Sequence, residues 1–260
     1  MLYLMLGFLG LLAGFLSGLL GIGGGIIMAP LLLYIPPLIG LDPISIHTIA
    51  GLTIIQSLTS GIVGAASHHQ FRFVSLKLTI VMGVTIFIAA LAGGAGAKLV
   101  SGELLLFIFG GLAFCAAILM LSPSQDNEES PEMAHLQFSH WRATIVALFV
   151  GLFGGLVGQG GSFILIPLMI YFVRIPTRLA IGSNLAIVLI SSVAAFLGKA
   201  VTGQIEWLMT LPIILTVIVA VRLGSLASHK VPVRWLRRIL AITIAIAALQ
   251  IWYSILPYFI

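Results

Sequence analysis

Charged side chains are scarce in this chain: Asp, Glu, Lys and Arg make up 7% of its 260 residues, whereas hydrophobic residues make up 60%. With a mean hydropathy of +1.23, the sequence has too few polar side chains to cover a soluble globule. The apolar runs are about 18 to 25 residues long, which suits helices that cross a membrane and does not suit the alternating strands of a barrel. The sequence therefore predicts an all-α integral membrane protein, a bundle of about 8 to 10 segments in the lipid bilayer.

Acidic residues are rarer still, seven in all. Four of them fall in one polar stretch, residues 122–140, and the other three, Asp42, Glu103 and Glu206, lie at expected helix ends. The chain thus lacks a carboxylate near the membrane centre, which cation carriers and proton relays use. It also lacks the paired acids or His-Glu metal motif of an intramembrane peptidase, so we expect no enzyme. These absences favour an anion or a neutral solute as the ligand.

Cys115 is the only cysteine, which excludes an intramolecular disulfide and a thiolate metal cluster. His68 and His69 are adjacent, so their side chains diverge on a helix and we expect no metal site there. The sequence has no Gly-Lys-Ser/Thr nucleotide loop, and its 12 Lys and Arg residues are scattered at helix ends. We therefore expect no cofactor and no nucleic-acid partner.

The first apolar segment follows no basic region, so we expect it to be retained as a membrane helix and not cleaved as a signal peptide.

A glycine motif occurs twice, each time followed by a proline and a tyrosine in an apolar run. The matched pairs are Gly14 and Gly151, Gly18 and Gly155, Gly21 and Gly158, Gly23 and Gly160, Gly24 and Gly161, Pro30 and Pro167, and Tyr34 and Tyr171. We interpret the chain as two homologous transmembrane repeats, residues 1–121 and 141–260, joined by a polar acidic linker at 122–140.

Each repeat begins with a segment too long for one simple span, about 3–34 and 141–173, so we expect each to break at its glycines. Six further spans are expected at about 44–66, 74–97, 103–121, 178–202, 207–228 and 233–257. Asp42 is placed to cap the first of these spans. Before the first break, Gly7, Gly10, Gly14 and Gly18 form a smooth face on which another helix can pack.

Two arrangements of the repeats remain open. With four simple spans per repeat, both halves run in the same direction, and the Lys and Arg residues divide eight to four between the two faces. If the long first segments turn back at their glycines, the halves are inverted, and one face collects all of these residues except Lys98 and Lys199. The positive-inside rule favours inversion. Lys199 and Arg222 lie near the ends of their spans. We expect these two side chains to snorkel to the membrane interface, in preference to a role in attracting anions.

Unwound glycine backbone at a helix N-terminus offers free N–H groups and a positive dipole end, which suit a small anion. We therefore expect the two glycine clusters to bind substrate, with side chains from the polar spans completing the site. The candidate residues are Gly21, Gly23, Gly24, Gly25, Thr48, Gln56 and Ser57 in the first half, and Gly158, Gln159, Gly160, Gly161, Ser162, Ser183, Asn184 and Ser191 in the second. The competing interpretation is that the glycines only pack helices and that the hydroxyls bond only to their own helix backbone.

The paired glycine motifs, together with Ala180-Ile181-Gly182-Ser183-Asn184-Leu185, resemble the TauE/SafE family of sulfite exporters over nearly the whole chain. In the first half, Ile46-His47-Thr48-Ile49-Ala50-Gly51 departs from this pattern, which argues against a symmetric site. The resemblance implies a plasma-membrane secondary transporter that exports small sulfur-containing anions such as sulfite, sulfonates or thiosulfate.

For such a transporter we expect two partners, a small anionic substrate and a coupling ion, either a proton or sodium. A coupling ion is expected because the sequence contains no ATP-binding motif. The alternatives are a transporter of another small anion or neutral solute, and a non-transport membrane scaffold with residues 122–140 as its handle.

Overall fold

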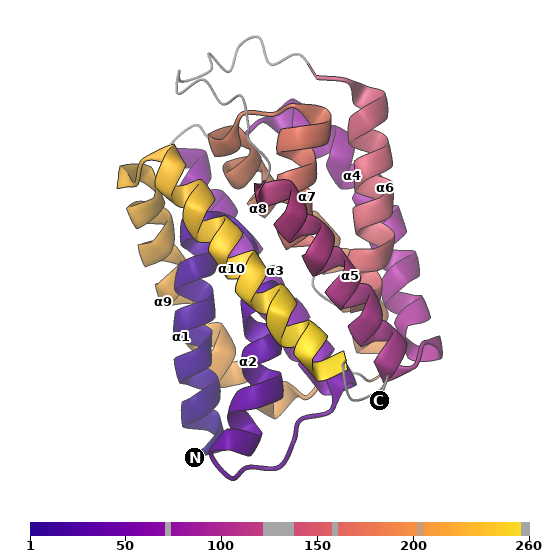
Figure 1. The fold of residues 1–260 in the computed structure, drawn as a ribbon, viewed down its shortest axis with the longest axis vertical. Coiled ribbons are helices and arrows are strands. Elements are labelled where there is room, and N and C mark those ends of the chain that lie inside the picture. Colours follow the sequence, from indigo (N-terminus) through magenta and orange to yellow (C-terminus); the bar gives the residue numbers. More distant parts are fainter. Residues whose placement is uncertain (71–73, 122–137, 158–160, 202, 204, 256–260) are drawn as a thin grey trace.

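The computed structural model describes residues 1–70, 74–121, 138–157, 161–201, 203 and 205–255, which form a bundle of helices (Figure 1). The helices are α1 (Leu2–Leu20), α2 (Gly25–Leu38), α3 (Ile46–Gln70), α4 (Leu76–Gly96), η1 (Ala97–Leu99), α5 (Gly102–Leu121), α6 (His140–Val157), α7 (Ser162–Leu168), η3 (Met169–Val173), α8 (Thr177–Val201), α9 (Trp207–Lys230) and α10 (Val233–Ile255). Within these described ranges there is no strand, and eight helices are long and apolar enough to cross a membrane. The predicted all-α membrane bundle is confirmed.

Serine side chains set the starts of two long helices. The hydroxyl of Ser45 accepts a hydrogen bond from Thr48 N at 3.1 Å and caps α3. Ser75 caps α4 in the same way, accepting from Leu78 N at 3.4 Å. The predicted cap at Asp42 is wrong, because α3 begins later than expected and Ser45 holds the capping position.

Both of the overlong segments consist of more than one helix. Residues 21–24 separate α1 from α2, whereas α6 ends at Val157 and α7 begins at Ser162 and is followed by η3. Gly21 adopts left-handed backbone, with a φ of 72°, and its N–H closes α1 by donating to Ser17 O at 2.8 Å. Gly161, with a φ of 66°, is the residue that precedes α7. The chain therefore changes direction at glycines that can adopt positive φ angles.

Each pair of helices is a hairpin that enters and leaves at the same end of the molecule. At the start of α6, Arg142 Nη1 donates to Phe172 O at 3.5 Å, and Phe172 lies near the end of η3. For the first pair, Figure 1 shows the loop after α2 at the same end as the start of α1. The chain therefore turns back after α1 and again after α6.

The two halves of the chain run in opposite directions. Along the contact between α3 and α8, Gly61 lies against Leu189 and Gly64 lies against Leu185, so these corresponding helices are antiparallel. Figure 1 shows α1 starting at the lower end of the view and α6 starting at the upper end. This is the arrangement that the inverted alternative requires, whereas the duplication itself stays a prediction.

Basic residues gather at one end of the bundle. We define this basic end by Lys77, Arg142, Arg174, Arg178, Lys230, Arg234, Arg237 and Arg238, all of which lie at or near helix termini. Side-chain hydrogen bonds tie these termini together, from α6 to η3, from α10 to η3, and from α8 to the residue after α9. Lys98, in η1, directly follows the C-terminal end of α4, whereas Lys77 lies at the start of that helix, so Lys98 lies at the opposite end. The positive-inside rule assigns the basic end to the cytoplasmic face.

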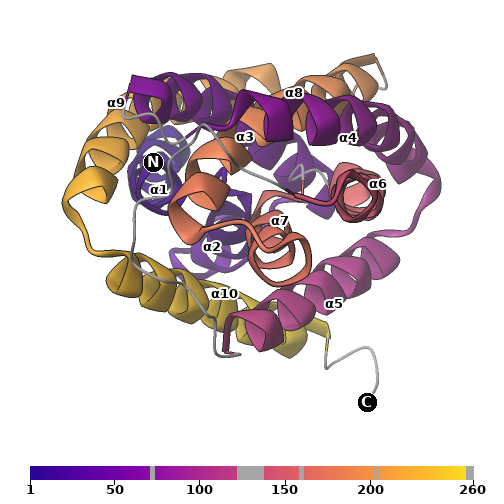
Figure 2. The same cartoon turned by 90° about the horizontal axis from the view of Figure 1, so that it is seen from above.

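The helices form three layers. Figure 2 shows α3, α4, α8 and α9 along one side, α5 and α10 along the other, and α1, α2, α6 and α7 between them. Glycines allow the closest helix contacts: a Cβ on Gly18 of α1 would lie 2.9 Å from Ser225 N of α9, and a Cβ on Gly93 of α4 would lie 2.9 Å from Leu156 N of α6. The predicted packing face on α1 is confirmed.

Candidate functional site

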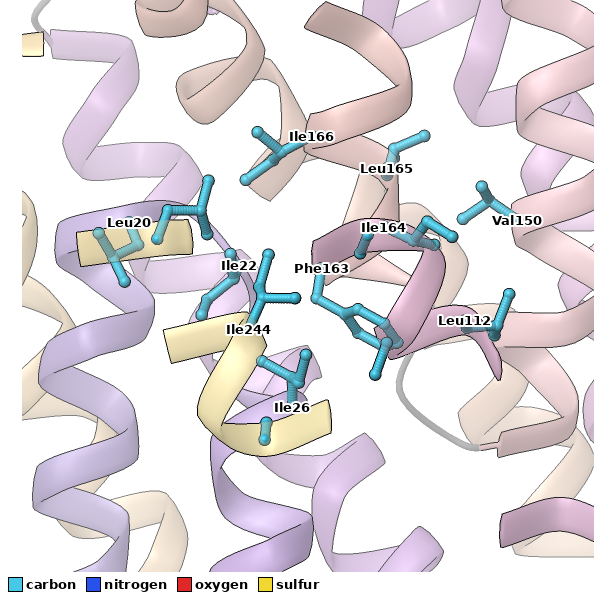
Figure 3. Close-up of a cluster of buried hydrophobic side chains, with 14 of the residues drawn as sticks. Leu20, Ile22, Ile26, Leu112, Val150, Phe163, Ile164, Leu165, Ile166 and Ile244 are labelled. Atoms are coloured by element: carbon cyan, nitrogen blue, oxygen red, sulfur yellow. The ribbon is translucent and has the colours of Figure 1, made fainter. Parts of the chain in front are cut away.

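The two glycine breaks meet inside the bundle. A Cβ on Gly23 would lie 3.1 Å from Ser162 Oγ, and that hydroxyl donates a hydrogen bond to Ile22 O. Figure 3 shows Ile22 beside Ile244, with Phe163 nearby from the second half of the chain. Buried apolar side chains from both halves thus surround the irregular backbone. In this apolar environment the polar groups of the breaks need hydrogen-bond partners, and neighbouring protein groups can supply them.

Asn184 connects the two breaks through its amide nitrogen. Its Nδ2 donates to Gly21 O and, at 3.1 Å, to Ser162 O. Helix α8 can approach the first break because Gly21 has no side chain, and a Cβ there would lie 2.5 Å from Ile181 O. The amide hydrogens of Asn184 therefore bind one carbonyl group from each break, that of Gly21 just after α1 and that of Ser162 at the start of α7.

Gln56 differs from Asn184, because both polar atoms of its amide are buried and neither has a hydrogen-bond partner among the described residues. It lies against Gly24, where a Cβ would be 3.0 Å from Gln56 Cδ. Gly24 precedes α2 and has a φ of 79°, and the first helical hydrogen bonds run from the N–H groups of residues 27 and 28 to its carbonyl oxygen. The N–H groups of residues 25 and 26 come before those bonds. The positive end of α2 and an amide with two N–H donors thus lie side by side.

α3 and α8 each carry a stripe of polar side chains that are fully buried and spaced to share one helix face. The stripes consist of Thr53, Gln56, Ser57 and Ser60 on α3, and Asn184, Ser191 and Ser192 on α8. The hydroxyls of Ser57, Ser60 and Ser192 have no partner within the part of the chain that the structure describes. A buried polar group without a partner costs stability, which makes these hydroxyls candidates for contact with a ligand.

Ser60 and Ser192 are absent from the residues that we predicted as a site. The sequence does contain a signal for them, since Ser60 follows Gln56 by four residues and Ser192 follows Asn184 by eight. Residues four or eight positions apart lie on nearly the same face of a helix, so each serine shares a face with the amide residue before it.

The structure places two of the predicted residues away from the breaks. Thr48 lies half-buried on the first turn of α3, where its hydroxyl accepts a hydrogen bond from Ser45 Oγ at 2.9 Å. Ser183 Oγ accepts from Ser75 N at 2.9 Å and so points to the start of α4. Gly158, Gln159 and Gly160 lie outside the described residues.

Lys199 is fully buried near the end of α8. The predicted snorkelling of this side chain is wrong. Helix α8 packs closely on small residues of α4 at this point, and a Cβ on Gly198 would lie 3.1 Å from Ala95 N. Arg222, in contrast, is exposed as expected.

A cavity of about 30 Å³ lies beside the N-terminal part of α2. Its lining includes Ala29 of α2, Thr53 of α3 and Phe109 of α5. This volume has room for little more than one water molecule. A larger solute does not fit into this cavity as it stands.

Comparison with known proteins agrees with this membrane architecture. The family model described as "Sulfite exporter TauE/SafE" matches residues 6–251. A "Probable membrane transporter protein" of Xylella fastidiosa (strain 9a5c) is 28% identical to this chain over 246 residues, which cover 94% of this chain and 92% of the relative. The "Probable membrane transporter protein YunE" of Bacillus subtilis (strain 168) is 23% identical, with 97% and 98% covered. No solved structure matches the chain. Because the family match includes both halves and both glycine breaks, this chain belongs to the TauE/SafE family of membrane transporters.

Proposed function

We propose that this protein is a secondary transporter that exports small sulfur-containing anions, such as sulfite, sulfonates or thiosulfate, across the plasma membrane. Membership of the TauE/SafE family supports the substrate class. The observation that carries the proposal is Gln56, a buried amide without a partner among the described residues, at the N-terminus of α2.

The substrate site of the proposal is formed by neutral hydrogen-bond donors. Gln56 contributes its amide N–H groups, Ser57 contributes a hydroxyl, and the N-terminus of α2 contributes backbone N–H groups and a positive dipole end. A site without a fixed charge binds an oxyanion and still releases it, because no buried salt bridge has to be broken. Asn184 and Ser162 have a different task, since their donors already hold the backbone of the breaks.

Transport in this proposal proceeds by alternating access of two inverted units. The α1–α2 and α6–α7 hairpins enter from opposite ends and meet at Asn184, and the small cavity beside α2 corresponds to a closed state. A rocking motion of one unit against the other exposes Gln56 to each face in turn. The sequence has no ATP-binding motif, so an ion gradient of protons or sodium, or the gradient of the substrate itself, supplies the energy.

A second candidate is the transport of a small neutral solute. Gln56 and Ser57 can each donate and accept hydrogen bonds, so the same pair also suits a polar molecule without charge. The two candidates differ in the charge that the solute itself carries across the membrane. A coupled ion adds its own charge in either case, so the response to membrane voltage separates the candidates only when coupling ions are absent.

Flux of labelled sulfite into proteoliposomes tests the proposal. We expect wild-type flux to exceed that of empty vesicles, and we expect Gln56→Met to reduce it about tenfold or more, since one hydrogen bond to a charged group is worth about 1.5–3 kcal/mol. Thr59→Val is the matched control on the same helix, because the Thr59 hydroxyl bonds only to Ile55 O of its own helix. Absence of sulfite flux in the wild type would overturn the substrate class. Equal flux in Gln56→Met and Thr59→Val would overturn the site.

Asn184→Leu and Gly24→Leu complete the series. Both should reduce flux, and both should also lower thermal stability, because Asn184 holds two carbonyl groups and Gly24 has positive φ. Loss of flux together with unchanged stability in Asn184→Leu would show that this residue contacts the substrate and does not hold the breaks.

A further inference from the structure

An apolar groove runs along the outside of the bundle between α5, α6 and the α7–η3 segment. Its volume is about 530 Å³, and its lining extends from Phe107 to Leu119 on α5 and from Ile145 to Phe153 on α6. Twelve residues of helix span about 18 Å. One leaflet of a bilayer has a hydrocarbon thickness of about 15 Å, half of the total. The groove thus has the length of one lipid acyl chain.

Arg142 lies at the mouth of this groove. It precedes Ile145 by one helical turn and shares the face of α6 that lines the groove. Its guanidinium lies 5.9 Å from the ring centroid of Phe172, a lining residue whose carbonyl oxygen it also contacts. Arg174 follows two residues after Phe172 and is exposed. Arg142 therefore places a cationic side chain at the end of the apolar groove that belongs to the basic end, as Arg174 also does.

The helices next to Arg142 at this mouth carry charges that are complementary to an anionic headgroup. α6, α7 and η3 contain no Asp or Glu, and the four acidic residues of the linker lie outside the described residues. The mouth belongs to the basic end, which the positive-inside rule assigns to the cytoplasmic face, where anionic lipids are enriched. A guanidinium binds a phosphate through two parallel hydrogen bonds, which a single ammonium group cannot do.

We propose that an anionic phospholipid binds in this groove, with one acyl chain between α5 and α6 and its phosphate at Arg142. The acyl chain also contacts Ile164 of α7, so the lipid holds the second hairpin against α5. This site is separate from Gln56 and does not depend on which solute is transported.

Cys115 offers a direct readout, because it is the only cysteine, it is exposed and it lines the groove. Purified full-length protein is titrated in detergent with phosphatidylglycerol or with phosphatidylcholine of the same acyl chains, and the rate of maleimide modification of Cys115 is followed. We expect phosphatidylglycerol to slow modification at lower concentration than phosphatidylcholine. We expect Arg142→Gln to weaken the apparent affinity for phosphatidylglycerol about tenfold.

Two variants separate the headgroup from the chain. Arg238→Gln is the control for charge, since Arg238 belongs to the basic end but lies over Trp235 on α10. Gly111→Leu fills the groove, because a Cβ on Gly111 has no neighbour within 4 Å. We expect protection by phosphatidylglycerol to persist in Arg238→Gln and to disappear in Gly111→Leu.

Several results would overturn the proposal. Equal protection by both lipids, or an unchanged affinity in Arg142→Gln, would remove the headgroup site. Protection of Cys115 that depends on protein concentration and not on lipid would identify a second copy of the chain as the occupant. If Arg142→Gln does not fold, the comparison of the two lipids on the wild-type protein still decides the proposal.

Discussion

Two buried amides next to the glycine breaks differ in their hydrogen bonding. Asn184 gives its N–H groups to carbonyls of both breaks, whereas neither polar atom of Gln56 has a partner among the described residues. An unpartnered amide in a protein interior costs about 1–3 kcal/mol. A residue with this cost is the place to expect a conflict between stability and function.

Replacing Gln56 by methionine should therefore separate stability from transport. The two side chains are similar in length, and Gln56→Met removes the unpartnered amide, so the variant should unfold at the same or a higher temperature than the wild type while its flux falls. Thermal unfolding in detergent, followed by circular dichroism, measures the first effect. A clearly lower unfolding temperature would mean that the amide has a structural partner and would argue against a ligand role.

The backbone at Gly24 should be more sensitive to substitution than that at Gly40. Both glycines have positive φ, 79° and 75°, so alanine at either position costs about 1–2 kcal/mol in backbone strain. At Gly24 the new Cβ also overlaps the amide of Gln56, whereas at Gly40 nothing lies within 4 Å. Gly24→Ala should thus be the more destabilising of the two in thermal unfolding.

The double variant Gly24→Ala/Gln56→Ala provides the control for that comparison, because shortening Gln56 removes the overlap and leaves the strain. It should recover part of the stability lost in Gly24→Ala, after correction for Gln56→Ala alone. If stability does not recover, the overlap with Gln56 is not the reason why Gly24→Ala is more destabilising than Gly40→Ala.

At the level of helices, the contact between α1 and α9 depends on glycine. Gly18 lies so close to α9 that a Cβ would be 2.9 Å from Ser225 N and nearer still to Val221 O. Gly18→Ala should therefore force the helices apart and lower stability by about 1–3 kcal/mol. Gly111→Ala, in a helix with open space around it, should be neutral or slightly stabilising, since alanine is the better helix former. Unfolding of both variants in detergent measures the difference.

Several elements could be predicted because their causes are local. The apolar runs define the long helices, and the positive φ of Gly21 and Gly24 interrupts a segment that is too long for one span. The cap of α3 was misplaced because Asp42 and Ser45 are both good capping residues, and only the helix start decides between them.

At the level of the whole molecule, the direction of each half is open to a direct test. In a Cys115→Ser background, single cysteines at Lys98 and Lys230 should react with membrane-impermeant maleimide from opposite sides of the membrane, since Lys230 belongs to the basic end and Lys98 lies at the other. Labelling of both from the same side would contradict the antiparallel arrangement and would restore the plain eight-span alternative.

The candidate site could be predicted only in part, because its contacts join distant parts of the chain. The sequence identifies Asn184 as a polar residue in an apolar span, but it cannot reveal that both amide hydrogens are bound to carbonyls of Gly21 and Ser162. The burial of Lys199 likewise depends on how closely α8 packs on α4. Such properties follow from tertiary packing, which residue spacing alone does not encode.

The meeting of the two hairpins has an electrical consequence. Because they approach from opposite ends, the two hairpins meet at the buried apolar cluster around Ile22 and Phe163, and in the proposed transport cycle the anion passes from one face to the other here. A monovalent anion that crosses the whole membrane in the favourable direction gains about 2.3 kcal/mol for each 100 mV. In the proposed function, with the basic end in the cytoplasm and a negative interior, the voltage pushes the anionic substrate outward and so favours export.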